Sequence, residues 1–337
     1  MATWKNSKIK MAALGLAVIM AVGAIGCGGA KKKEEPKKWS KASVGIVQLV
    51  EHAALDAANK GFVDGLAKRG YKEGENISYD RQNAQADQSN LQNIANRFVN
   101  NKVDLICAIA TPAAQTVANA TNTIPIVGTA ITDYKAAKLV KDNNKPGGNV
   151  TGTTDMNPVA AQLDLLLKIK PGIKTVGTIY TSSEVNSQIQ IDILKKAAEA
   201  KNVKVIEATV SSVNDIQQAA RSLVGKCEGI YVPTDNILAS AMPTLTMITD
   251  EAKLPVICGE ENMVAAGGTA TLGINYYELG LVTGDMAADI LQGKAKPAEM
   301  AIQSQKQFTP VINLKVADKL GVKIADELLK GATVIRK

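Results

Sequence analysis

The sequence has a single histidine, His52, in 337 residues. This scarcity excludes zinc sites built on paired histidines and leaves room for at most one Ser-His-Asp or Cys-His arrangement. Enzyme motifs are missing as well: there is no CxxC, no GxSxG, no Walker loop and no GxGxxG after the first expected strand. The sequence alone therefore predicts no metal site, no cofactor and no catalytic centre.

Aromatic residues are also scarce, at 4% of the chain, whereas hydrophobic residues make up 46%. A hydrophobic content dominated by Ala, Val, Ile and Leu is expected of parallel sheets covered by helices on both faces. The part that follows residue 42, about 295 residues, is longer than one hydrophobic core usually serves. We therefore expect two lobes.

The net charge of +7 lies almost entirely near the N-terminus. Residues 1–26 carry three lysines and no acids, and residues 31–41 carry six lysines and two glutamates. The remainder, 42–337, is neutral. Because a neutral body has no phosphate-binding footprint, we do not expect a nucleic-acid partner.

The N-terminus has the pattern of an export signal. Three lysines precede an uncharged, mostly apolar run over 11–26, which ends at Cys27. The run is shorter than the roughly 18 or more apolar residues of a membrane-spanning helix. We therefore expect a protein that works outside the cytoplasm.

The boundary Ala24-Ile25-Gly26-Cys27 resembles a bacterial lipoprotein signal, although Ala24 stands where that pattern usually has Leu. The resemblance implies that 1–26 is removed and that Cys27 carries a lipid. An ordinary secretory signal with an incidental cysteine is the alternative. Residues 27–42 are lysine-rich and have no apolar periodicity, so we expect a solvated tether.

The other cysteines are odd in number and widely spaced. Cys107 and Cys258 each lie in an apolar, strand-like run, and Cys227 lies apart from both. We expect all three to be unpaired and shielded, acting as small hydrophobic side chains.

Strand-like and helix-like segments alternate along the chain, with a turn-rich break at 143–149. The strands expected before the break are 44–50, 77–80, 103–110 and 124–129, and the helices are 53–69, 88–100 and 112–120. After it, the expected strands are 175–180, 203–209, 229–232 and 255–258, and the helices are 158–169, 184–201, 213–224 and 238–252. This order predicts an α/β fold of two doubly wound parallel-sheet lobes with a ligand cleft between them.

Four motifs in order resemble the substrate-binding lipoproteins of ABC transporters, in the subgroup related to tryptophan and tyrosine uptake. These are the stretches Val44–His52, Ala110–Ala114, Lys145–Gly152 and Tyr231–Asn236. The resemblance implies a type I periplasmic-binding-protein fold with three crossovers between the lobes. It also implies that helix 276–291 returns to lobe 1, giving 43–154 plus 275–295, while lobe 2 comprises 155–274 plus 312–337.

Ligands of such sheets bind at the carboxyl ends of the strands. Thr111 before Pro112 reads as a helix N-cap, and Ser182 and Ser183 precede another expected helix. Helix starts suit a carboxylate, and the alternative is an ordinary capped helix that ends in solvent.

An amino acid also needs a partner for its ammonium group. Asp235 is the first candidate for this role and Glu260 the second, since each follows an expected strand. The alternative for either residue is that it caps the next helix. Other ligand-binding candidates at strand ends are Gln48, His52, Thr132, Asp133 and Asn275.

The sequence thus predicts a monomeric, lipid-anchored, extracytoplasmic receptor that delivers a small solute to an ABC permease and its ATPase. We expect the solute to be an amino acid, with an aromatic one as the narrower option. The alternatives are a sensor domain that signals to a membrane partner and an extracytoplasmic enzyme.

Overall fold

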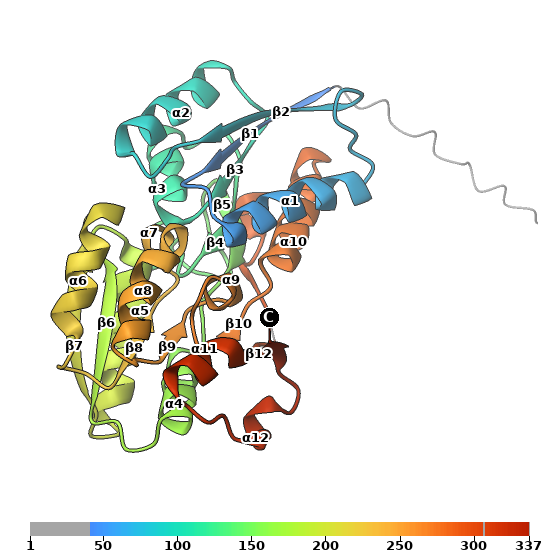
Figure 1. Cartoon of the computed structure of the whole chain (residues 1–337). Coiled ribbons are helices and arrows are strands. Elements are labelled where there is room, and N and C mark those ends of the chain that lie inside the picture. The colour runs from blue at the N-terminus through green and yellow to red at the C-terminus, as the bar shows by residue number, and fades with distance from the viewer. Residues whose placement is uncertain (1–40, 306, 337) are drawn as a thin grey trace, which may run out of the picture. The chain divides into compact units, whose positions relative to one another are not determined.

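Two sheets of mainly parallel strands, each flanked by helices, account for the alternating order along the chain (Figure 1). The computed structural model describes residues 41–305 and 307–336. The expected signal peptide at 1–26, Cys27 and the expected tether up to residue 40 lie outside the described residues.

The first sheet belongs to lobe 1, and its six strands within the described residues follow the order β11-β5-β4-β3-β1-β2, all parallel. Its strands are β1 (Ala42–Gln48), β2 (Ile77–Asn83), β3 (Leu105–Ile109), β4 (Ile126–Ile131), β5 (Val150–Thr154) and β11 (Gln303–Ser304). Its helices are α1 (Ala53–Lys68), α2 (Gln88–Asn100), α3 (Thr111–Ala120) and α10 (Tyr276–Leu291). Every residue of β3 and β4 is buried, as expected for strands covered on both faces.

The second sheet belongs to lobe 2, and its seven strands in the described part of the chain follow the order β13-β12-β10-β9-β8-β6-β7. Only the β10–β12 pair is antiparallel. The strands are β6 (Thr175–Thr181), β7 (Lys204–Val210), β8 (Gly229–Val232), β9 (Val256–Cys258), β10 (Ala270–Gly273), β12 (Thr309–Asn313) and β13 (Thr333–Ile335). The α-helices are α4 (Val159–Ile169), α5 (Val185–Glu199), α6 (Ile216–Leu223), α7 (Asn236–Ser240), α8 (Met242–Glu251), α9 (Glu261–Ala265), α11 (Leu314–Leu320) and α12 (Asp326–Leu329). Two 3₁₀ turns complete the described elements: η1 (Val213–Asp215) and η2 (Pro297–Glu299).

The predicted fold class is confirmed, with one local correction. The helix expected over 238–252 is two helices, α7 and α8, which meet at Ala241. Pro243 lies in the first turn of α8. Proline lacks an N–H and its ring clashes with the preceding turn, so it is tolerated at a helix start and not in a helix interior. A new helix therefore begins just before it.

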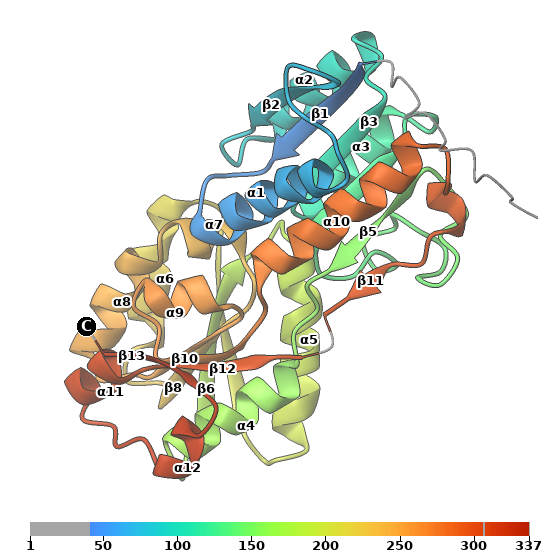
Figure 2. The ribbon, with the colours of Figure 1, turned by 90° about the vertical axis from the view of Figure 1, so that its right-hand side faces the viewer.

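Helices α1 and α10 lie side by side in both views of the ribbon, although more than 200 residues separate them (Figures 1 and 2). Glycines line the contact on both sides: Gly61 and Gly65 on α1, Gly280 and Gly284 on α10. A Cβ added at Gly65 would lie 2.5 Å from the carbonyl oxygen of Leu281, and one at Gly61 would overlap that of Tyr277. The two backbones therefore touch directly, which no larger residue would allow.

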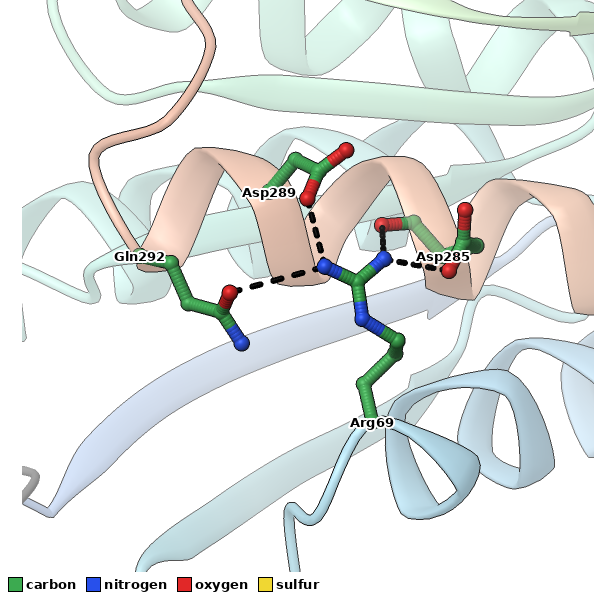
Figure 3. Close-up of polar contacts among 4 residues, drawn as sticks. All are labelled: Arg69, Asp285, Asp289 and Gln292. Atoms are coloured by element: carbon green, nitrogen blue, oxygen red, sulfur yellow. Dashed lines mark hydrogen bonds and ion pairs between the residues drawn. The ribbon is translucent and has the colours of Figure 1, made fainter. Parts of the chain in front are cut away.

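Arg69 extends this contact beyond the end of α1 (Figure 3). Its guanidinium donates to the carboxylates of Asp289 and Asp285 on α10 and to the amide oxygen of Gln292, the C-cap of that helix. These hydrogen bonds raise the pKa of Arg69, and the one to Asp289 has the largest effect. Because the arginine side chain is still 26% exposed, we regard the ion pairs as a modest addition to the glycine contact.

The prediction for the cysteines within the described residues is confirmed. Cys107, Cys227 and Cys258 are all buried and free. Burial raises the pKa of each thiol, so these side chains remain neutral and unreactive.

We expect Gly61→Ala to lower the free energy of unfolding by about 2–3 kcal/mol, because the added methyl group must push α1 away from the backbone of α10. Urea unfolding followed by circular dichroism measures the loss. Gly148→Ala is the matched control, since an added Cβ there meets nothing within 4 Å. Equal effects of the two substitutions would contradict close packing at Gly61.

Candidate functional site

A narrow pocket lies where strand ends of both sheets approach the crossover segments. We call it the deep pocket. Its apolar lining residues are Leu55, Ala130, Ala239 and Met263. Its neutral polar lining residues are His52, Thr132, Asn186, Thr234, Asn236 and Tyr276. Its acidic lining residues are Asp155, Asp235 and Glu260.

The three carboxylates are almost completely buried, with exposed fractions of 3% for Asp155, 0% for Asp235 and 2% for Glu260. Among the described residues, no lysine or arginine lines the deep pocket. Burial therefore raises the pKa of all three, that of Glu260 to about 7. Such a pocket favours a positively charged or hydrogen-bond-donating ligand group.

Asp235 is held by four donors from its own lobe. Its oxygens accept hydrogen bonds from the amide and the hydroxyl of Thr181, at 2.6 and 2.8 Å, and from the hydroxyl of Ser187, at 2.7 Å. The fourth donor is the amide of Leu238, at 2.9 Å, which makes Asp235 the N-cap of α7. The capping role that the sequence left open for Asp235 is therefore present.

Glu260 also caps a helix. Its carboxylate accepts the amides of Asn262 and Met263, both at 2.7 Å, and the side-chain amide of Asn262 at 3.0 Å. These contacts make it the N-cap of α9. Like Asp235, it combines a structural role with a place in the pocket wall.

Asp155 is a pocket residue that sequence reasoning missed. It follows β5 in the first crossover between the lobes and accepts hydrogen bonds from two hydroxyls. These come from Thr132, at 2.9 Å, and from Tyr276, the first residue of α10, at 2.7 Å. Asp155 therefore joins two of the segments that connect the lobes.

One hydrogen bond closes the deep pocket across the cleft, between Nε2 of His52 and Oδ1 of Asn236, at 3.3 Å. The side-chain amide of Asn236 donates to Glu184 at 2.6 Å, so its oxygen faces the histidine and Nε2 must be the donor. Burial lowers the pKa of His52, and the hydrogen bond to Asn236 partly offsets this by raising it. Burial, and then the nearby charge of Asp235, raises the pKa of Glu184 to about 8.

Asn186 has a fixed orientation. Its amide nitrogen donates to Glu184 at 2.8 Å and to the carbonyl oxygen of Thr234 at 3.0 Å. A flipped amide would turn its oxygen toward those two acceptors, so the assignment is unambiguous. Its Oδ1 is buried and has no hydrogen-bond partner among the described residues. A buried acceptor of this kind calls for a donor.

The predicted helix starts are corrected in detail. The N-cap of α3 is Ala110, with φ of 86°, and Thr111 is the first helical residue instead. The hydroxyl of Thr111 is buried without a partner in the described part of the chain. The N-cap of α5 is Glu184, and neither Ser182 nor Ser183 caps it. The reason is that the N-cap lies one residue before the expected hydroxyl in α3 and one residue after it in α5.

Five of the predicted site residues line a space between the lobes. His52, Thr132, Asp235 and Glu260 line the deep pocket. Ser183 lines a neighbouring space, the outer cleft, to which Pro112 and Glu184 also contribute.

The remaining predicted residues make local contacts away from the lining of the deep pocket. Gln48 bonds to Asp56 and Asn59 of α1, and Asn275 is exposed and caps α10. Asp133 accepts amides of its own turn, and the Ser182 hydroxyl donates weakly to Val210.

A sequence pattern existed for Asn186. On α5 the buried face carries Asn186, Ser187 and Gln190 where a core-facing helix normally carries apolar residues. Three buried polar side chains on one helix face indicate a polar wall. Asp155 had no comparable pattern, because a lone acid in a turn-rich segment is usually exposed.

Within residues 41–305 and 307–336, no helix combines the length and apolar character needed to cross a membrane. The same residues contain no group of three or more His, Cys, Asp or Glu side chains placed to bind a metal ion.

We expect Asp235→Ala to lower the free energy of unfolding by about 3 kcal/mol, because buried donors lose their acceptor and α7 loses its cap. Asp87→Ala is the control and should cost about 1 kcal/mol, since this exposed N-cap of α2 accepts one amide. Thermal and urea unfolding of both proteins checks the order. A smaller loss for Asp235→Ala than for Asp87→Ala would contradict it.

Residues 43–335 match the family described as ABC transporter substrate binding protein. The chain is 47% identical to the tyrosine-binding protein of Clostridioides difficile. The matched region of 264 residues covers 78% of this chain and 76% of that relative. The family predicted from the four motifs is thereby confirmed.

Solved structures agree with this relationship. The ABC domain from Streptococcus pneumoniae in complex with L-Trp is 40% identical with a TM-score of 0.85, over 88% of this chain and 100% of the other. A ligand-free, open substrate binding protein from Clostridium difficile is 44% identical over 88% and 99%, yet its TM-score is 0.68. The lobes here are therefore arranged more like those of the tryptophan complex.

The wider structural matches show the predicted type I periplasmic-binding-protein fold. The pocket between two α/β lobes, the family match over nearly all described residues and the close relatives lead to one conclusion. The chain belongs to the ABC transporter substrate-binding protein family, a family of solute receptors and not of enzymes.

Proposed function

We propose that this protein binds an aromatic L-amino acid, tyrosine or tryptophan, in the deep pocket and delivers it to an ABC permease and its ATPase. The names of the two closely similar proteins, one tyrosine-binding and one in complex with L-Trp, support this ligand class.

The observation that carries the proposal is the electrostatic asymmetry of the pocket. Three buried carboxylates, those of Asp155, Asp235 and Glu260, line the deep pocket, so this part of its wall is negative and suits an ammonium group. On the lobe 1 side, the lining residue His52 is the N-cap of α1, and no described side chain caps this helix. Uncapped helix N-termini present free amides and the positive end of the helix dipole, which suit a carboxylate. A zwitterionic amino acid complements both walls.

The apolar lining supports an uncharged side chain on that amino acid. Leu55 of lobe 1 and Ala239 and Met263 of lobe 2 line the same pocket. An aromatic ring packs well against such aliphatic and thioether groups. Tyr276 supplies the only aromatic side chain among the described lining residues, and its hydroxyl is already bound to Asp155.

Delivery requires that the cleft between the lobes opens and closes. Few hydrogen bonds between described residues hold the cleft closed. His52 bonds to Asn236 at 3.3 Å, and the hydroxyls of Thr132 and Thr234 lie 3.5 Å apart. Such weak links are readily broken and remade, so the bound ligand supplies most of the energy of closure.

We expect the purified protein to bind L-tyrosine or L-tryptophan with a Kd in the micromolar range or below, corresponding to about −8 kcal/mol or better. Titration calorimetry with the individual L-amino acids measures this affinity. Arginine and glutamate serve as controls, since a second charge has no partner in the apolar part of the pocket. Absence of binding by every aromatic amino acid would contradict the proposal.

We also propose that the protein is held at the outer face of the cell membrane by a lipid on Cys27. The support is the lysine-flanked apolar run, the small residues before the cysteine and the lysine-rich stretch that follows. One lipid chain gives marginal anchoring by itself, and the basic stretch provides a second attraction to anionic headgroups.

Cys27→Ser should release the protein from the membrane fraction without changing its amino-acid binding, because Cys27 precedes residues 43–335, which match the binding-protein family. Cell fractionation and labelling with a radioactive fatty acid test this expectation. Cys227→Ser, which changes a buried thiol of the body, should leave the label in place. Retention of the Cys27→Ser protein in membranes would argue against the anchor.

A further inference from the structure

We propose that Asp155, together with the amide oxygen of Asn186, receives the ammonium group of the bound amino acid. This assignment rests on the proposed function and names the residues that would select an α-amino group. It differs from the order expected from sequence, in which Asp235 and then Glu260 ranked first.

Counting the acceptor sites of the carboxylates decides among the three acids. An ionised carboxylate offers about four lone-pair sites. Asp235 already accepts four hydrogen bonds from protein donors, and Glu260 accepts three. Asp155 accepts two from neighbouring side chains. Asp155 therefore has the largest remaining capacity for the three N–H donors of an ammonium group.

Asn186 provides an independent observation at the same pocket. Its Oδ1 is a buried acceptor without a partner among the described residues, while its amide nitrogen is fixed on Glu184 and Thr234. Asn186 is 3% exposed and lines the deep pocket, as Asp155 does. A donor entering the pocket satisfies an atom that the protein leaves unpaired.

The charge balance favours the same assignment. Asp155 is 3% exposed, and its two described side-chain partners are neutral hydroxyls. A buried carboxylate with few hydrogen-bond donors gains strongly from a cation, because little else compensates its desolvation. Asp235, by contrast, already has two amides and two hydroxyls around its charge.

The position of Asp155 also connects ligand charge to lobe closure. Asp155 follows β5 in the first crossover, and its partner Tyr276 begins α10 directly after the second. An ammonium group on Asp155 therefore binds at the segments that must move when the cleft opens, so ligand charge and hinge position become coupled.

The test compares L-tyrosine with 3-(4-hydroxyphenyl)propionate, which is the same molecule without its amino group. The parent protein should prefer tyrosine by at least about 100-fold, because the analogue leaves Asp155 buried without a counterion. Asp155→Asn keeps the shape and removes the charge. It should weaken tyrosine by about 100-fold, leave the analogue unchanged or tighter, and so abolish the preference.

Two further variants complete the experiment. Asn186→Ala should reduce the preference by about 10-fold, because one acceptor is lost while the carboxylate remains. Asp133→Asn is the control and should preserve the preference, because Asp133 lies outside the lining of the deep pocket and accepts amides of its own turn. If Asp155→Asn fails to fold, as judged by its unfolding transition, the Asn186→Ala result decides.

An Asp155→Asn or Asn186→Ala protein that keeps the full preference for tyrosine would overturn the assignment, and so would an equal loss of the preference in Asp133→Asn. Equal binding of tyrosine and its analogue by the parent would overturn the assignment while leaving the proposed function intact. A parent protein that binds no aromatic amino acid would instead contradict the proposed function, and the assignment with it.

Discussion

The backbone contact between α1 and α10 is the constraint on which the site depends. Glycines at 61, 65, 280 and 284 let the two helices touch, and this fixes α10 on lobe 1 even though it follows the main part of lobe 2 in the chain. Because a helix is a rigid rod, fixing its body also fixes its first residue, Tyr276. That residue carries the hydroxyl that orients Asp155 at the pocket. A packing requirement made far from the ligand thus sets the geometry at the ligand.

Buried negative charge is handled in two different ways at this site. Asp235 and Glu260 are neutralised locally by helix N-termini, whose amides and dipoles stabilise a carboxylate within its own lobe. Asp155 lacks that compensation, since its two described side-chain partners are the hydroxyls of Thr132 and Tyr276. The first pair stabilises the fold of lobe 2 in the open and closed forms alike. Asp155 makes closure sensitive to what enters the cleft.

Sequence reasoning located the fold and part of the site for identifiable reasons. Alternating apolar runs and amphipathic segments predicted the sheets and helices, and parallel strands converge at their carboxyl ends, which placed Asp235 and Glu260 correctly in the pocket wall. It missed Asp155 and Asn186, whose proximity depends on crossovers between distant segments. It also assigned the caps of α3 and α5 to the wrong residues, since the entry of a chain into a helix depends on local backbone angles such as the positive φ of Ala110.

The sequence by itself determined the α/β class, the family, the shielded cysteines and the neutral character of the body, because each follows from local periodicity, composition or ordered motifs. Only the tertiary structure decided which buried carboxylates already accept as many hydrogen bonds as they can. That difference is invisible along the chain: Asp235 and Asp155 are both single acids after strands, and four donors surround one while two surround the other. Hydrogen-bond capacity is set by neighbours in space, and those neighbours come from segments that only folding brings together.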